Sequence, residues 1–238
     1  MGTQIARVLS IHVGGPRELG TDGAADPMER RWTSGIFKDP VHGPVWLGRT
    51  NLRGDAQADL QHHGGPDKAV CVYPAVHYPF WHIELGGAEL PFGAFGENFT
   101  VAGLTEPDVC IGDQFEVGGA RVQLSQPRQP CWKLARRWRV KELAARVQET
   151  GYTGWYFRVL REGWVEAGTP LVLVERAHPE WTVERGNQVM HHARHDRAAA
   201  RALAACPMLS ASWQETLALR ARTGESPDPA RRTVGANE

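Results

Sequence analysis

The stretch QFEVGGARVQLSQPRQPCWKL, residues 114–134, contains the two patterns on which a prediction of the fold depends. Apolar and polar residues alternate on both sides of Gly118 and Gly119, which is typical of two strands joined by a tight hairpin turn. The second strand ends in a turn stiffened by Pro127 and Pro130, and a helical pattern follows. We therefore expect a β-hairpin whose end leads directly into a helix.

Short strand patterns of the same kind recur along the first 175 residues or so, and turns rich in glycine and proline separate them. Further strands are predicted at 5–13, 45–47, 68–73, 99–104, 153–160 and 171–175. Helices are expected at 74–85, 130–138 and 140–150, and a loop at 14–31. Many short strands with a few inserted helices predict a mainly β fold with some α, built on a β-barrel or closed sheet.

The composition changes after Pro179, where three short helices are expected at 181–195, 197–205 and 210–222. Leu209, Trp213 and Leu217 recur every four residues and form one apolar stripe, and Thr182 is a suitable N-cap. We therefore divide the chain into three parts. They are a β domain at 1–178, a helical module with a modest core of its own at 179–223, and a tail at 224–238. The tail is rich in Pro, Gly, Arg and Ala and is predicted to be disordered.

Charge is balanced over the 238 residues, with 27 Lys and Arg against 27 Asp and Glu. A balanced chain has no overall electrostatic footprint for nucleic acid or for an anionic membrane surface, so neither partner is expected. No apolar run approaches the ~20 residues of a membrane-spanning helix. The first residues alternate like a strand and lack the layout of a signal peptide, so we expect a cytoplasmic protein.

The four cysteines do not form a C-x-x-C pair, which argues against a zinc ribbon or a thioredoxin-like dithiol. In a reducing compartment their thiols should be free. Cys71 and Cys110 lie in apolar surroundings, and Cys206 has no reactive context, so these three are expected to serve packing. Cys131 stands in a different setting.

Cys131 follows the proline-stiffened turn and stands at the expected start of a helix. Backbone N–H groups at a helix N-terminus favour negative charge, and Arg128, Lys133, Arg136 and Arg137 add positive charge nearby in the sequence. Both effects are expected to lower the pKa of the Cys131 thiol. Because a thiolate attacks electrophiles or binds soft metals, we take Cys131 as the reactive centre.

Two further segments carry candidate site residues. The pattern H-G-G-x-D-K at 63–68 combines glycines, which let main-chain N–H groups approach an anion, with Lys68, a point charge suited to phosphate. It is not a Walker A loop. In Gly-Glu-Asn at 96–98, Glu97 and Asn98 offer polar side chains at the start of a strand.

With these residues in view, the chain resembles the MOSC family, a domain also found at the C-terminus of molybdenum-cofactor sulfurases, and within it the stand-alone YiiM-type branch. The similarity covers roughly residues 38–220. It rests on the stretches GDAQADLQHHGGPDKAVCVYPAVHY, GAFGENF, EPDVCIGDQFEVGGARVQLSQPRQPCWKL and WTVERGNQVMHH. The resemblance implies a MOSC-type β-barrel with peripheral helices and a small C-terminal three-helix module, which agrees with the boundary near Pro179.

The resemblance also implies roles for single residues. Cys131 would be the sulfur ligand of molybdenum in a molybdopterin cofactor, and Glu97 and Asn98 would lie near the metal and orient water or substrate. The cofactor-binding residues would be His63, Gly64, Gly65, Asp67, Lys68 and Arg128.

YiiM-type proteins are linked to the reduction of N-hydroxylated bases such as 6-hydroxylaminopurine, so the resemblance implies an oxidoreductase that cleaves an N–O bond with two electrons. The sequence contains no flavin, haem or iron–sulfur motif, so a separate redox protein would donate the electrons. The oligomeric state is left open, with a homodimer as one option.

Two other functions remain open. The first is a metal-free cysteine enzyme in which Cys131 is the nucleophile and His62 or His63 the base. The second is a non-catalytic carrier or sensor that binds the molybdenum cofactor, or its sulfur, and delivers it.

Overall fold

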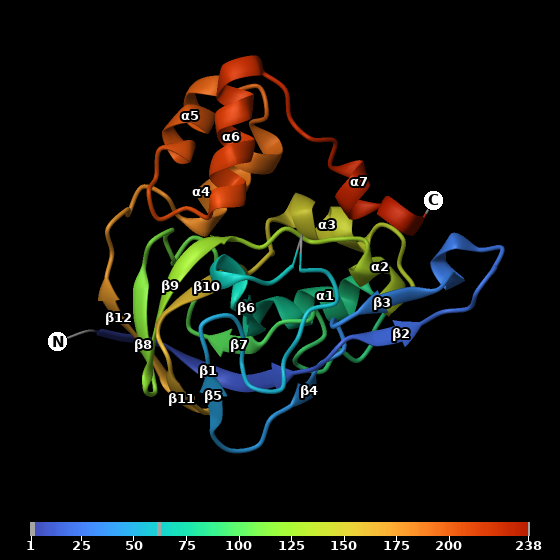
Figure 1. Ribbon diagram of the computed structural model, residues 1–238, viewed down its shortest axis with the longest axis horizontal. Helices are drawn as coiled ribbons and strands as arrows, with labels where there is room; N and C mark the ends of the chain where they lie inside the picture. Colours follow the sequence, from blue (N-terminus) through green and yellow to red (C-terminus); the bar gives the residue numbers. More distant parts are fainter. Residues whose placement is uncertain (1–2, 61–62, 238) are drawn as a thin grey trace.

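The centre of the protein, seen in a computed structural model that describes residues 3–60 and 63–237, is a closed β-barrel (Figure 1). Seven strands form it, in the order β12 (Pro170–Glu175), β8 (Gln114–Val117), β9 (Ala120–Pro127), β10 (Trp155–Arg161), β6 (Val70–Pro74), β7 (Phe99–Ala102) and β1 (Thr3–Val13). The barrel closes where β12 pairs with β1. Neighbouring strands in the barrel are antiparallel, except β6 and β7, which are parallel. The predicted barrel is therefore confirmed.

The predicted hairpin joins β8 to β9, with Val117 opposite Ala120. Gly118 has φ 57°, and a Cβ atom on it would lie 2.5 Å from the backbone oxygen of Trp164, so the turn requires glycine there. Strand β9 runs on to Pro127, which pairs with Trp155 of β10. The turn that contains Pro127 and Pro130 therefore lies at one end of the barrel.

Five shorter strands lie outside the barrel. They are β2 (Arg17–Leu19), β3 (Trp32–Ser34), β4 (Asp39–Pro40), β5 (Val45–Leu47) and β11 (Gly163–Val165). Strand β4 pairs with β1, and the others form two separate two-stranded sheets, β2 with β3 and β5 with β11. The segment 14–31 was predicted as a loop, but β2 pairs with β3, and a 3₁₀ turn, η1 (Pro27–Glu29), lies between them. The pattern missed this hairpin because its strands are only three residues long.

Helices lie around one end of the barrel. They are η2 (Pro66–Lys68), η3 (Ala75–His77), α1 (Tyr78–Glu84), α2 (Lys133–Trp138) and α3 (Leu143–Thr150). An aromatic core that includes Tyr73, Trp81 and Phe95 packs beneath them. Helix α2 begins at Lys133, three residues later than predicted, because Pro130 and Cys131 belong to the turn.

The C-terminal module contains α4 (Val183–Asn187), the π-helical turn η4 (Gln188–His192), α5 (Arg197–Ala204) and α6 (Ala211–Thr223). Thr182 caps α4 as predicted and accepts a hydrogen bond from the Arg185 N–H. The predicted stripe is buried, with Trp213 1% exposed and Leu217 fully covered. The core of the module is continuous with that of the barrel rather than separate.

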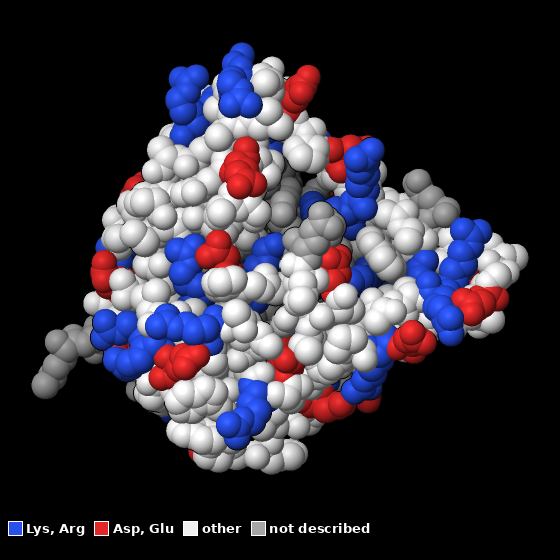
Figure 2. Space-filling model, in the orientation of Figure 1, with Lys and Arg blue, Asp and Glu red and all other residues white. Residues whose placement is uncertain are grey.

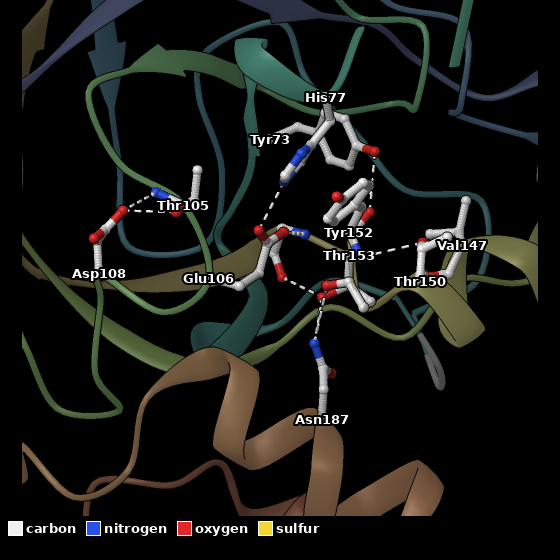
Figure 3. A network of polar contacts seen from close by, with 12 residues as sticks. Tyr73, His77, Thr105, Glu106, Asp108, Val147, Thr150, Tyr152, Thr153 and Asn187 are labelled. Atoms are coloured by element: carbon white, nitrogen blue, oxygen red, sulfur yellow. Dashed lines mark hydrogen bonds and ion pairs between the residues drawn. The ribbon is translucent and has the colours of Figure 1, made fainter. Parts of the chain in front are cut away.

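A buried polar network fastens the module to the barrel (Figure 3). Asn187 Nδ2 donates to Thr153 Oγ1 at 2.8 Å. The Glu106 carboxylate accepts the Gly154 N–H at 2.7 Å and lies 2.7 Å from His77 Nε2. Because these buried groups are hydrogen-bonded, the start of β10 is held in a fixed position relative to α4.

The tail at 224–238 was predicted to be disordered, and this is wrong for its described part. It contains α7 (Ala230–Thr233) and η5 (Gly235–Asn237), which return to lie beside α2 and α3 (Figure 1). Arg136 Nε donates to Asn237 Oδ1 at 2.8 Å, and the Trp132 N–H donates to the Arg232 carbonyl at 2.8 Å. Composition did not reveal this order because it comes from polar contacts with residues a hundred positions away.

No helix in the described ranges is long and apolar enough to cross a membrane.

Candidate functional site

Two adjoining cavities open at the end of the barrel where β9 leads into α2. The inner cavity has a volume of about 90 Å³ and the outer one about 700 Å³. Both are lined by His63, Lys68, Gln129, Cys131, Lys133 and Tyr156. Cys131 thus stands at the boundary between a small cavity and a large one.

The backbone places Cys131 at this boundary through the turn that follows β9. The Arg128 N–H donates to the Gly154 carbonyl at 3.0 Å, which continues the pairing with β10, and the Cys131 carbonyl accepts the Leu134 N–H at 3.0 Å. Cys131 is half-buried, whereas Cys71, Cys110 and Cys206 are buried free thiols, as predicted. Cys71 also borders the inner cavity, where burial raises its pKa to about 11.

The lining of both cavities is strongly positive. In the described residues the inner cavity has no carboxylate in its lining, and its cations are Lys68, Arg128, Lys133 and Lys38, of which Lys38 is paired with the buried Asp55 behind the lining. Asp59 is the one described carboxylate that lines the outer cavity, and its cations are Arg31, Lys68, Lys133, Arg136, Arg231 and Arg232. The chain has zero net charge, so this clustering creates a local site for anions.

Arg128, in the lining of the inner cavity, carries a donor that no described residue accepts. The residue is 6% exposed, and its Nη2 donates to the Phe95 carbonyl at 2.6 Å. Its Nη1 is buried and has no hydrogen-bond partner in the described part of the chain. Because a buried charged donor without a partner is costly, an anionic group in the inner cavity would stabilise it.

The H-G-G-x-D-K segment divides between the cavity and the framework. His63, Gly64 and Lys68 line the inner cavity, whereas Gly65 and Asp67 do not. Gly64 has φ 91°, a left-handed conformation that favours glycine. Burial, followed by the positive charge of Lys133, lowers the pKa of His63 to about 4. His63 is therefore a neutral hydrogen-bonding group at neutral pH.

Asp67, predicted to bind the cofactor, faces away from both cavities. Its Oδ1 lies 2.9 Å from Arg158 Nη2, and its Oδ2 accepts the Ala211 N–H at 3.2 Å at the start of α6. Its carbonyl accepts from Ser125 Oγ at 2.5 Å. Asp67 therefore joins β9, β10 and the helical module.

Glu97 is not brought to either cavity. It is fully buried, and its carboxylate accepts from the Gly93 N–H at 2.7 Å, Thr100 Oγ1 at 2.9 Å, the Phe95 N–H at 3.1 Å and the Tyr78 hydroxyl. Burial raises the pKa of Tyr78, so its hydroxyl stays a donor. Glu97 fixes the loop whose Phe95 carbonyl holds Arg128.

Asn98 does line the inner cavity, but its amide is fully engaged. Its Oδ1 accepts the Cys71 N–H at 3.0 Å, and its Nδ2 donates to the His12 carbonyl at 3.1 Å and to Asp55 Oδ2 at 3.0 Å. Asn98 is therefore suited to fixing the cavity wall rather than to contacting a ligand through a free group.

Sequence reasoning missed Tyr156, which lines both cavities. Burial raises the pKa of Tyr156, so the phenol stays protonated and can donate a hydrogen bond. The alternation along β10 contained the signal, because Trp155 and Phe157 face the core and Tyr156 must face the other way. The contribution of Arg231 and Arg232 was hidden by the predicted disorder of the tail.

The metal-ligating side chains at the cavities fit a metal that is held mainly by an organic cofactor. Among residues 3–60 and 63–237, no group of three or more His, Cys, Asp or Glu side chains is placed to hold a metal ion. Cys131 would be a single soft ligand, and a sulfur-containing cofactor would have to supply the rest.

A Cys–His pair is not formed in the described residues. No hydrogen bond joins Cys131 Sγ to His63 there, and His62 lies outside the described residues. With a pKa of about 4, His63 would also be a weak base for a thiol.

Comparison with known proteins assigns both parts of the chain to a class. A family model described as MOSC domain matches residues 59–172, and one described as YiiM-like, 3-alpha helix domain matches 181–224. The barrel and the three-helix module are thus those of a MOSC-domain protein with a C-terminal helical domain. The chain belongs to the MOSC family, in its YiiM-like form.

The relatives are bacterial and fungal. The chain is 50% identical over 207 residues to Uncharacterized protein YflK of Bacillus subtilis (strain 168), covering 87% of this chain and 90% of YflK. It is 40% identical over 204 residues to Protein YiiM of Escherichia coli (strain K12), covering 85% and 91%. The crystal structure of YiiM from Escherichia coli matches with a TM-score of 0.75 at 36% identity, over 82% of this chain and 93% of that one.

A third relative bears a functional name. It is a Reductase of Gibberella moniliformis (strain M3125 / FGSC 7600), 37% identical over 154 residues, which are 63% of this chain and 27% of the fungal protein.

Proposed function

We propose that this protein is a molybdenum-cofactor oxidoreductase that reduces N-hydroxylated compounds, such as 6-hydroxylaminopurine, to amines, with Cys131 as the metal ligand. The observation that carries the proposal is the position of Cys131, half-buried at the boundary of two cavities lined by cations. Membership of the MOSC family and the fungal relative named Reductase support an oxidoreductase.

The residues present suit the proposed cofactor. The outer cavity, at about 700 Å³, falls in the range of roughly 300–1,000 Å³ that cofactor and ligand sites occupy. The phosphate of molybdopterin would be held by Lys68, by the backbone at Gly64 and by the unpaired Nη1 of Arg128. His63, neutral at pH 7, would add a hydrogen bond rather than a charge.

When bound, the cofactor would supply a two-electron couple, so that an N-hydroxylamine, two electrons and two protons give an amine and water. A separate redox protein would deliver the electrons, because the sequence contains no motif for a second redox group.

The chain's own residues would orient the substrate and supply a proton. Tyr156 is held protonated beside Cys131, so its hydroxyl could donate to the substrate oxygen that leaves as water. Lys133, 9% exposed, adds positive charge at the same boundary and would favour the anionic form of a bound group. Asn98 would keep the inner wall in place through its bonds to Cys71 and Asp55.

Activity of the holoprotein tests this function. We would express the chain in a host that makes the molybdenum cofactor and measure reduction of 6-hydroxylaminopurine with an artificial electron donor. Cys131→Ser should abolish turnover while circular dichroism stays unchanged, and Cys206→Ser, in a buried thiol outside both cavities, should retain it.

Turnover that persists in Cys131→Ser would contradict the proposal. Cofactor binding without turnover of any N-hydroxylated compound would favour the carrier or sensor instead. Activity of metal-free protein, lost on alkylation of Cys131, would favour a nucleophilic cysteine.

A further inference from the structure

A third cavity of about 230 Å³ lies between the helical module and the C-terminal tail. It shares Gln129, Thr216, Arg231 and Arg232 with the outer cavity, so the two spaces adjoin. Figure 2 shows the surface hollowed between the module and the tail, with Lys and Arg side chains beside the hollow. A ligand in the outer cavity could therefore extend one end into this space.

The lining of this third cavity is cationic. Its charged residues are Arg194, Arg220, Arg231, Arg232 and Asp228. The guanidinium groups of Arg220 and Arg232 are held by uncharged acceptors, so their positions are fixed while their charge is not neutralised. These acceptors are the backbone oxygens of Val189, Met190 and Pro130 and the side chains of Ser226 and Gln148. Asp228 uses Oδ1 to accept the Ala230 N–H at 2.9 Å.

Two groups at this cavity are available to a ligand. Arg231 is exposed and donates no hydrogen bond to any residue that the structure describes. His191 Nε2 is buried and has no partner among the same residues. Burial, followed by the charge of Arg232, lowers the pKa of His191 to about 3, so the ring is neutral at pH 7 and can donate through Nε2. Arg194 adds a half-buried guanidinium, tied through Nη2 to the Pro227 carbonyl at 3.2 Å.

Part of this cavity lies beyond the regions that define the family. The two family models end at residues 172 and 224, whereas Arg231 and Arg232 belong to the tail that follows. The tail is held in place by Arg136 and Trp132, so its arginines face the cavities from a fixed backbone.

We propose that the third cavity is an anion subsite for the phosphate of a nucleotide substrate whose base lies in the outer cavity. Planar guanidinium groups and a neutral imidazole N–H are suited to the several acceptor oxygens of a phosphate monoester. The preferred substrate is then an N-hydroxylated nucleoside monophosphate, which would bind more tightly than the free base. This inference rests on the proposed function.

Binding to the cofactor-free protein tests the subsite without turnover. Titration calorimetry would compare adenosine 5′-monophosphate with adenosine, which differ only in the phosphate. We expect the monophosphate to bind at least about tenfold more tightly, as charged hydrogen bonds of ordinary strength allow. Arg231→Gln and Arg194→Gln should each reduce this ratio, and Arg185→Gln, an exposed arginine of the same module outside the cavities, should not.

Arg231→Gln removes no described hydrogen bond, so it changes the charge while the fold is kept; a matching melting temperature would verify this. Equal affinities for the two ligands would overturn the subsite. The subsite would also be overturned if Lys68→Gln removed the difference in affinity between the two ligands while Arg194→Gln and Arg231→Gln kept it. The phosphate would then lie in the inner cavity.

Turnover separates the two proposals. If 6-hydroxylaminopurine is reduced but the phosphate adds no affinity, the subsite is wrong and the proposed function stands. If the monophosphate binds in an Arg194- and Arg231-dependent way but no N-hydroxylated compound is reduced, the subsite is supported and the proposed function is wrong.

Discussion

Glu97 shows how a single buried carboxylate can control a site that it does not touch. Its four donors fix the loop that presents the Phe95 carbonyl to Arg128. The local pattern Gly-Glu-Asn could not reveal this role, because the donors come from residues that only the fold brings together. Asp67 was predicted to bind the cofactor, and its structural role was missed for the same reason, since its partner Arg158 is distant in the sequence.

Glu97→Gln should destabilise the protein, because an amide NH₂ cannot accept hydrogen bonds and one or more donors lose their partner. We expect the free energy of unfolding to fall by about 2–3 kcal/mol. Urea denaturation would measure it, with the exposed Glu89→Gln as the matched control. Equal stability of the two variants would contradict the role given to Glu97.

His63 should make stability depend on pH. Its pKa in the folded protein is about 4, below the value of about 6.5 for an unfolded histidine. Between these values the unfolded chain binds a proton that the folded protein does not, so the free energy of unfolding falls as pH falls from about 6.5 to about 4.

His63→Gln should therefore flatten this part of the stability profile, and the exposed His42→Gln should not. The effect will be partial, because His191 also has a depressed pKa, at about 3. Denaturation midpoints measured at several pH values would show it. An unchanged slope in His63→Gln would mean that His63 is not buried as described.

At the scale of elements, patterns that depend on neighbours in sequence were predictable. The hairpin around Gly118, the cap at Thr182 and the stripe through Trp213 are all local signals, and the structure confirms them. The tail was not predictable, because α7 and η5 depend on contacts with α2 and α3 rather than on their own composition.

Arg136 is the main polar anchor of the tail. Besides Asn237, its guanidinium donates to the carbonyls of Ala236, Pro27 and Arg30. Arg136→Gln should release the tail and increase hydrogen exchange of the amides in residues 230–237 by at least about tenfold, as the loss of one or more charged hydrogen bonds predicts. Arg201→Gln, on the exposed face of α5, is the control. Unchanged protection would show that the remaining contacts of the tail, such as those of Arg232 with Pro130 and Gln148, hold it without Arg136.

At the scale of the whole molecule, the barrel end, the helical module and the tail surround one cationic space. The barrel contributes Lys68 and Tyr156, the module contributes Thr216, and the tail contributes Arg231 and Arg232. The barrel was predictable from the number and spacing of its strands. The cavities were not, because they form between parts of the chain whose relative placement no local pattern determines.

The central claim is that Cys131 holds molybdenum. Metal analysis and X-ray absorption at the molybdenum edge, on protein from a host that makes the cofactor, test it most directly. The account predicts about one molybdenum per chain in the native protein. In Cys131→Ser it predicts either loss of the metal or loss of one sulfur from its coordination shell. Native metal content with an unchanged sulfur shell in Cys131→Ser would contradict it.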